Sequence, residues 1–309
     1  MFCRFLQACI LRHVVCICNF IVHIYLVKHQ YLRYKLYKFC RQGILVALQK
    51  GNKPPETAHR TSISGLLGKS TFDSDLSLSN QIVTELSRLI ETIEIQPGEL
   101  ISENEVALAL GISKTPVREA LIRLEEINFV KIVPRVGSYV TKINIDNYIE
   151  ACFVRLVLES GAVKAAAKRS TASAKEKLFK PLLVEQQKAH ENQDHAAFYT
   201  LDQNLHRMFF EVAGVPGVWK TIKRSQTDVN RIRHLKRMFG ISRAAQIVQE
   251  HQLIVDAICT GNATAAEEAL VAHIGSLDRE IDTLASHTDL MAYIDTLNAA
   301  QPRRRERQT

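Results

Sequence analysis

The sequence predicts a mainly α-helical protein in which a winged helix-turn-helix precedes an all-α antiparallel helical bundle. Three observations support this prediction. Apolar residues recur at helical spacing from Leu78 onward. Two helical segments separated by Gly111 are followed by a β-rich hairpin at 129–141. After Asn144 the sequence has no clear strand pattern, so we expect only helices there.

The composition is that of a globular protein whose basic charge is confined to one end. The chain has 309 residues, 46% of them hydrophobic, and a formal net charge of +8. This length suits two ordinary domains. Residues 1–60 hold ten Lys or Arg and one acidic residue, so the rest of the chain is close to neutral. Any nucleic-acid surface on the body must therefore be a local cluster of basic residues.

Residues 1–75 differ from the rest of the chain, and we expect an atypical extension and linker there. The apolar run from Val14 to Val27 is interrupted by Asn19 and His23, and it is shorter than the roughly 20 residues that a membrane span needs. Three alternatives stay open: a disordered extension, a start-site artefact or a membrane anchor. Five of the seven cysteines lie in the first 40 residues without a Cys-x-x-Cys pair, which indicates a reduced, cytoplasmic protein.

Residues 76–143 carry the signals of a helix-turn-helix. A first amphipathic helix is predicted over 78–93. A second begins at Ser102, which with Glu105 forms a capping box, and Gly111 ends it. A third helix follows at once, with Ser113 at its N-cap.

The third helix has an apolar back and a polar front. Its front end carries two basic side chains and hydroxyl groups, which is typical of a helix that lies in a DNA major groove. The residues on this front are Ser113, Lys114, Thr115 and Arg118. The alternative is that Lys114 and Arg118 belong to an ordinary solvated face. The hairpin that follows is a predicted wing, with Arg135 and Gly137 at its tip.

Residues 144–287 are predicted to form the helical bundle, and 288–309 a charged C-terminal tail. Breaks at small or turn-forming residues separate the helices. The predicted helices are 146–169, 174–191, 194–213, 216–239, 241–260 and 262–286.

One carboxylate and three imidazoles of the bundle form a candidate metal site. Asp202 and His206 lie four residues apart and so share one helix face, while His251 and His273 lie on later helices. These donors suit a first-row divalent metal with one or two open positions. The alternative for any single histidine is packing or hydrogen bonding in the core.

The first helical region closely resembles the GntR family of bacterial winged-helix repressors. The resemblance rests on Gln96-Pro97-Gly98-Glu99-Leu100, on the run Leu110 to Leu124 and on the wing at Gly137. It implies that Ser113, Lys114, Thr115 and Arg118 meet DNA, together with Arg135 and Gly137 of the wing. The family often has Arg where Lys114 and Asn104 stand, which indicates weaker phosphate contacts here. For Arg123, ion pairing with Glu119 or Glu126 is the alternative to a DNA contact.

The bundle resembles the FCD ligand-binding domain of the FadR subfamily. The matching motifs are Arg155 with Glu159, Leu201-Asp202 with His206, Glu250-His251, Gly261-Asn262 and His273. The resemblance implies that Asp202, His206, His251 and His273 ligate Zn²⁺, Ni²⁺ or Mn²⁺ beside a pocket for an organic acid. Arg155 is the expected partner of the effector carboxylate, with an ion pair to Glu159 or Glu150 as the alternative. Asn230 and Arg231 are the further residues expected to line this pocket.

Together these patterns predict a metabolite-responsive transcription regulator rather than an enzyme. We expect a homodimer that binds a pseudo-palindromic double-stranded operator under the control of a small carboxylate effector. The alternatives are a metal-dependent hydrolase built on the bundle, a regulator with a purely structural metal, and a membrane-tethered regulator.

Overall fold

The computed structural model of the protein describes residues 62–67, 72–73, 76–169, 171–241, 243–275 and 277–299. These residues fall into two compact units. The larger unit holds the described residues of 62–275 and 288–299, and the smaller one contributes 277–287. The basic extension at 1–60 and the arginines at 303–307 lie outside the described residues.

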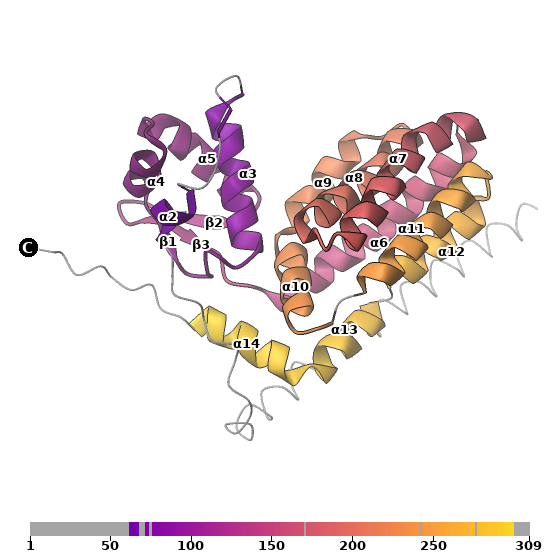
Figure 1. Ribbon diagram of the computed structural model, residues 1–309. Coiled ribbons are helices and arrows are strands. Elements are labelled where there is room, and N and C mark those ends of the chain that lie inside the picture. The colour runs from indigo at the N-terminus through magenta and orange to yellow at the C-terminus, as the bar shows by residue number, and fades with distance from the viewer. Residues whose placement is uncertain are drawn as a thin grey trace, which may run out of the picture. The chain divides into compact units, whose positions relative to one another are not determined.

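The N-terminal part of the larger unit is a small helical domain with a three-stranded sheet (Figure 1). One apolar core, which includes Leu86, Val106, Leu121 and Val140, joins its helices to the sheet. Its elements are α2 (Ile63–Leu67), α3 (Leu78–Glu91), β1 (Leu100–Ile101), α4 (Glu103–Leu110), α5 (Lys114–Glu126), β2 (Val130–Val133) and β3 (Gly137–Val140).

The turn between α4 and α5 follows the predicted pattern with one exception. The Ser102 hydroxyl accepts a hydrogen bond from the backbone N–H of Glu105 at 3.4 Å. Gly111 ends α4 in the left-handed region, at φ 66°, where glycine has no steric cost. Ser113 occupies the N-cap of α5 but its side chain makes no capping hydrogen bond, so that detail of the prediction is wrong.

The wing is the antiparallel pair β2 and β3, as predicted. Val133 lies opposite Gly137 in the register, and Arg135 turns the chain at φ 63°. Gly137 lies at φ 142°, a conformation that favours glycine, and a Cβ atom there would also lie 2.4 Å from Cδ1 of Leu100 in β1. The sequence does not predict β1, because two residues are too short to show alternation.

The second part of the larger unit is an all-helical bundle (Figure 1). Helix α6 packs against α8 and α12, and α11 packs against α7 and α12. The core between these helices includes Val163, Phe179, Phe209, Ile254 and Leu270. The bundle helices are α6 (Ile145–Lys168), α7 (Ala172–Glu191), α8 (His195–Ala213), α9 (Gly217–Ser225), α10 (Thr227–Met238), α11 (Ala244–Cys259) and α12 (Ala263–Ile274).

Two predicted helices are each divided in the structure. The segment 216–239 forms α9 and α10, which meet at Gln226. The segment 262–286 forms α12 and, in the smaller unit, α13 (Leu277–Ser286); Gly275 follows α12 at φ 87°. Helical periodicity persists through both breaks, so the sequence predicts one helix in each case.

Two segments predicted to lack helices contain short ones. Ile63 and Leu67 of α2 are buried in the core of the N-terminal domain, although 1–75 is predicted to be extension and linker. The predicted tail begins with α14 (Thr288–Ala299), which buries Leu290, Ile294 and Leu297. In both segments tertiary burial stabilises a helix too short to form alone.

Candidate metal centre and nucleic-acid interface

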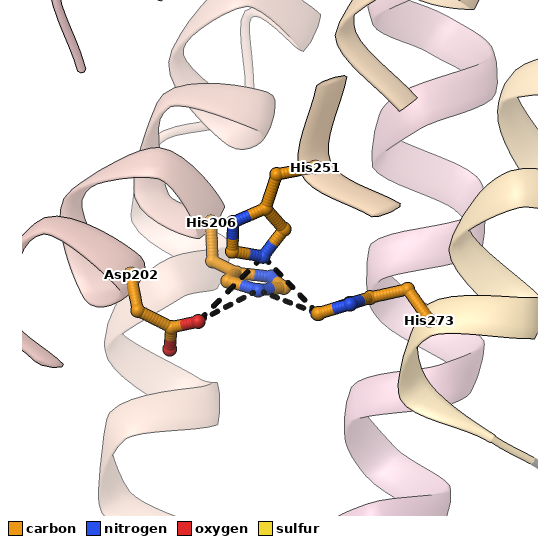
Figure 2. A group of neighbouring side chains, drawn as sticks. All are labelled: Asp202, His206, His251 and His273. Atoms are coloured by element: carbon orange, nitrogen blue, oxygen red, sulfur yellow. Dashed lines mark hydrogen bonds and ion pairs between the residues drawn. The ribbon is translucent and has the colours of Figure 1, made fainter. Parts of the chain in front are cut away.

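Four side chains from three helices converge in the bundle (Figure 2). Asp202 and His206 extend from consecutive turns of α8, His251 comes from α11 and His273 from α12. All four are buried, and their candidate ligand atoms lie within 4.8 Å of one another. The structure therefore brings together the four residues that the sequence predicts as metal ligands.

The spacing of these atoms suits a shared cation. The Nε2 atom of His273 lies 3.2 Å from Nε2 of His251 and 3.3 Å from Nε2 of His206. Oδ1 of Asp202 lies 3.8 Å from Nε2 of His206 and 3.6 Å from Nε2 of His251. A tetrahedral zinc ion with bonds of about 2.0–2.1 Å keeps its donors roughly 3.3–3.4 Å apart. The four donor atoms thus need only small movements to reach a common ion.

Each histidine ring is held by its other nitrogen. Nδ1 of His206 lies 2.5 Å from Oε2 of Glu159. Nδ1 of His251 lies 2.8 Å from Oε1 of Gln186, and Nδ1 of His273 lies 2.9 Å from Oε2 of Glu250. Because all three partners are oxygen acceptors, each Nδ1 carries the proton and donates it. Each Nε2 of a neutral ring then presents a lone pair, as metal-binding histidines do.

Burial keeps two of these rings neutral. Burial and the neighbouring His273 lower the pKa of His251 well below its usual value. Burial also lowers the pKa of His273, against the effect of its hydrogen bond to Glu250. Burial alone would raise the pKa of Asp202, but Arg233, the neighbouring histidines and Arg155 together outweigh it and hold that pKa well below the usual range. The cluster therefore combines a carboxylate with lone pairs that repel one another unless a cation lies between them.

Arg233 is a residue of this site that the sequence does not reveal. Its Nη1 donates to Oδ2 of Asp202 at 3.1 Å, while Oδ1 of the same carboxylate faces the histidines. Gln186 and Glu250 were missed in the same way, since each meets its histidine across helices. No spacing within one helix signals such contacts; only the adjacency of Glu250 and His251 in a motif gave a hint.

Arg155 lies beside the cluster, but its charge is already paired. Nε of Arg155 donates to Oε1 of Glu159 at 2.8 Å, with both side chains buried. Its Nη2 lies 3.5 Å from Nδ1 of His206. Arg155 and His206 outweigh the burial of Glu159 and lower its pKa to about 2. The ion pair with Glu159 is thus the alternative that the structure realises, in place of a free effector-binding arginine.

Asn230 and Arg231 make their contacts elsewhere, which corrects the expectation that they line the metal pocket. The Asn230 amide donates to Oε1 of Glu91, at the end of α3. Arg231 donates to the backbone oxygen of Thr141 and pairs with Asp228. Both side chains therefore join α10 to the N-terminal domain. Arg233, which lies three residues after Asn230 and two after Arg231 on the same helix, contacts Asp202 of the cluster.

The predicted DNA-binding residues lie together at the start of α5 and on the wing. Five of them are exposed: Ser113, Lys114, Thr115, Arg118 and Arg135. The Arg118 guanidinium forms a 3.0 Å ion pair with Glu103 at the start of α4. Arg123 hydrogen bonds to Asn80 of α3, and not to either glutamate expected from helical spacing.

Among the described helices between residues 62 and 299, none combines the length and apolar character that crossing a bilayer requires.

Comparison with known proteins gives two family matches. Residues 78–140 match the bacterial regulatory proteins of the gntR family, and residues 150–276 match the FCD domain. The chain is 30% identical over 204 residues to the transcriptional repressor RspR of Escherichia coli K12, covering 66% of this chain and 89% of that protein. It is 28% identical over 229 residues to the repressor NanR of Cronobacter sakazakii, covering 65% and 84%.

Solved structures show the same fold. E. coli McbR/YncC superposes with a TM-score of 0.57 at 22% identity, over 69% of this chain and 99% of that one. A GntR regulator from Rhodococcus sp. RHA1 gives 0.54 at 18% identity, over 70% and 99%. The winged helix followed by a helical bundle is thus a shared architecture.

Proposed function

Because the chain belongs to the GntR family of DNA-binding transcription regulators and carries an FCD domain, we propose that it is a dimeric repressor whose operator binding responds to a metal-bound carboxylate effector. The observation that carries the proposal is the convergence of three histidine Nε2 atoms and one carboxylate, with every Nδ1 held by an acceptor. The family consists of regulators rather than enzymes, which sets the hydrolase alternative aside. Action on DNA supports the proposal of a cytoplasmic location.

The donor set indicates a divalent metal such as Zn²⁺, Ni²⁺ or Mn²⁺. Asp202, His206, His251 and His273 would hold the ion through three nitrogens and one oxygen. Four protein ligands leave one or two positions for water or effector at a metal that accepts five or six donors. The metal would supply a fixed positive charge for an anionic ligand.

The surroundings of the cluster favour an effector with a carboxylate and further polar groups. Arg233 is partly exposed and can turn from Asp202 to a ligand carboxylate, a role that Arg155 cannot take while it is paired with Glu159. The Tyr199 hydroxyl and Oε1 of Gln203 are buried and have no hydrogen-bond partner among the described residues. Buried groups of this kind are normally satisfied. A hydroxy acid or sugar acid would satisfy them.

DNA binding is proposed to use the exposed start of α5 and the wing. Ser113, Lys114, Thr115 and Arg118 would lie in the major groove, with Arg135 and Gly137 at the adjacent backbone or minor groove. Two copies related by a twofold axis would require a pseudo-palindromic operator. We assign repression because RspR and NanR, two similar proteins, are named repressors.

The test uses the full chain loaded with Zn²⁺, Ni²⁺ or Mn²⁺ in turn. Native mass spectrometry counts subunits and bound metal, and calorimetry with a panel of hydroxy acids and sugar acids measures effector binding. We expect a dimer with one metal per chain and heat of binding for at least one acid. The Asp202→Asn variant, which keeps the shape of the side chain, should lose the metal and the heat together.

Two results would contradict the proposal. If the metal-loaded protein shows no heat of binding with any acid of the panel, the metal has only a structural role. If the wild-type protein takes up no metal, the proposed metal site is wrong.

A further inference from the structure

Helix α10 makes three hydrogen-bonded contacts to the winged helix. The Thr227 hydroxyl donates at 2.6 Å to the carbonyl of Ile127, the residue that ends α5. The Asn230 amide donates at 2.6 Å to the carboxylate of Glu91, which ends α3. The Arg231 guanidinium donates at 2.6 Å to the carbonyl of Thr141, just after the wing. The end of the proposed recognition helix is therefore held directly by α10.

The same helix contacts the metal cluster. Arg233 donates to Asp202 at 3.1 Å, and it follows Asn230 by three residues. Residues three apart lie on one side of a helix, about 4.5 Å apart along its axis. Because α10 is one helix of 12 residues, it can carry a displacement of Arg233 to Asn230.

The buried Tyr199 hydroxyl is influenced by charged groups at both contacts. It lies on α8, three residues before Asp202, and its hydroxyl is buried. After burial, the charge of Glu91 is the largest influence that raises the pKa of Tyr199, and the charge of Asp202 raises it too. The last residue of α3 and a proposed metal ligand thus act on one phenol.

The contact between α10 and the winged helix is polar and incompletely satisfied. Burial raises the pKa of Glu91, and the hydrogen bond from Asn230 and the charges of Lys223 and Arg231 only partly oppose this rise. Oδ1 of Asn230 and Nε of Arg231 are buried without a hydrogen-bond partner among the described residues. All these groups gain water if α10 shifts. A small change in the position of α10 can therefore alter how tightly the winged helix is held.

We infer that α10 couples the metal cluster to the DNA-binding domain. Arg233 is the positioning residue, because its position depends on Asp202. At the other contact, Thr227, Asn230 and Arg231 bind the end of α5, the end of α3 and the segment just after the wing. The inference rests on the proposed metal site. A divalent cation at Asp202 shares the carboxylate charge and repels the guanidinium, which weakens the Arg233–Asp202 pair. Metal loading thereby changes the strength of the contacts between α10 and the winged helix.

The test is hydrogen exchange of the full chain, measured by mass spectrometry with Zn²⁺ and with EDTA, alongside elemental analysis. In the wild type we expect Zn²⁺ to change exchange several-fold over residues 86–95 and 125–143. Arg233→Gln, measured at saturating Zn²⁺ with its metal content reported by the elemental analysis, should lose this change. Arg237→Gln is the matched control, because Arg237 lies one turn further on the same helix, is exposed and pairs only with His234 in the described structure. It should respond like the wild type.

A second variant tests the other end of the helix. Asn230→Asp places a carboxylate against Glu91, so exchange over 86–95 should rise several-fold even in EDTA, and adding Glu91→Gln should restore it. An unchanged zinc response in Arg233→Gln, or unchanged exchange in Asn230→Asp, would overturn the coupling while leaving the metal site intact. Absence of zinc from the wild type in elemental analysis would instead overturn the proposed site, and the inference with it.

Discussion

Glu159 shows how a single buried carboxylate can support both the ligands and the charge balance of the cluster. One oxygen accepts from Nδ1 of His206 and the other from Nε of Arg155, and neither partner is exposed. The ring of His206 is thereby oriented with Nε2 toward the other ligands. Partners of this kind raise the basicity of a metal-binding imidazole as well as fixing its direction.

Glu159→Gln should therefore weaken both the metal site and the fold. A neutral amide leaves Arg155 as a buried charge without a counter-ion, which costs about 3–5 kcal/mol. Loss of the carboxylate behind His206 should reduce metal affinity about 10- to 100-fold. Urea titration and zinc competition with a chromogenic chelator measure the two effects. Glu185→Gln is the control, because its pair with Lys188 is exposed and should contribute almost nothing.

Arg118 and Glu103 give opposite predictions for DNA binding. Arg118→Ala should weaken operator affinity by about tenfold to a hundredfold, as loss of a guanidinium at the DNA does. Glu103→Gln frees that guanidinium from its ion pair and removes a negative charge near the phosphates, so affinity should rise a few-fold. Fluorescence anisotropy with a duplex selected from a random library measures both. Unchanged affinity in Arg118→Ala would exclude it from the interface.

Residues were predictable from the sequence where they act within one helix or one turn. Asp202 and His206 share a face because of their spacing, His251 and His273 are candidates as imidazoles on later helices, and the resemblance joins all four into one ligand set. Gln186, Glu250 and Arg233 meet the cluster from separate helices, so no local pattern marks them. For Arg155 the sequence leaves open an effector carboxylate or an ion pair, and the packed structure shows the ion pair with Glu159.

Among the elements, α10 is the one that the sequence misses in both extent and role. Its periodicity continues that of α9, so no local pattern marks the break at Gln226, and only the structure shows that Thr227, the first residue of α10, contacts Ile127. Helix α2 has only five residues, too few to show a periodic pattern. Helix α14 does carry Leu290, Ile294 and Leu297 at helical spacing, so the expectation of a tail without a helix there is wrong although the sequence contains the pattern. Conversely, α3 to α5, the wing and the long bundle helices were predicted because periodicity, caps and glycines agree.

We expect the protein to lose stability in acid because of His234, a residue of α10. Burial, together with the charge of Arg237, lowers the pKa of His234 to about 4. The unfolded chain protonates this residue near pH 6.5. The unfolded state therefore binds more protons between these values, and the free energy of unfolding should fall as the pH drops from about 6.5 to 4. His234→Gln should flatten this part of the curve in thermal melts. An equally steep curve in the variant would contradict the assignment.

At the scale of the whole molecule, the connection between the two domains of the larger unit is held from two sides. Arg231 binds the carbonyls of Thr141 and Lys142. The Asn298 amide of α14 pairs with both the N–H and the carbonyl of Ile143. The segment that the sequence predicts as a tail thus helps to fix the chain between the winged helix and the bundle.

Metal removal should separate the stability of the bundle from that of the winged helix. The cluster joins α8, α11 and α12, so an ion bound only in the native state adds about 2.7 kcal/mol at a free concentration a hundred times its dissociation constant. EDTA should lower the melting temperature of the wild type and leave that of His206→Ala with His251→Ala unchanged. Asp202→Asn serves as a milder control, since it leaves no cavity. The winged helix has its own core around Leu86 and Leu121, so exchange at 117–124 should be protected in all of these proteins. Loss of that protection in EDTA would mean that the winged helix depends on the metal for its folding, and not only for its position.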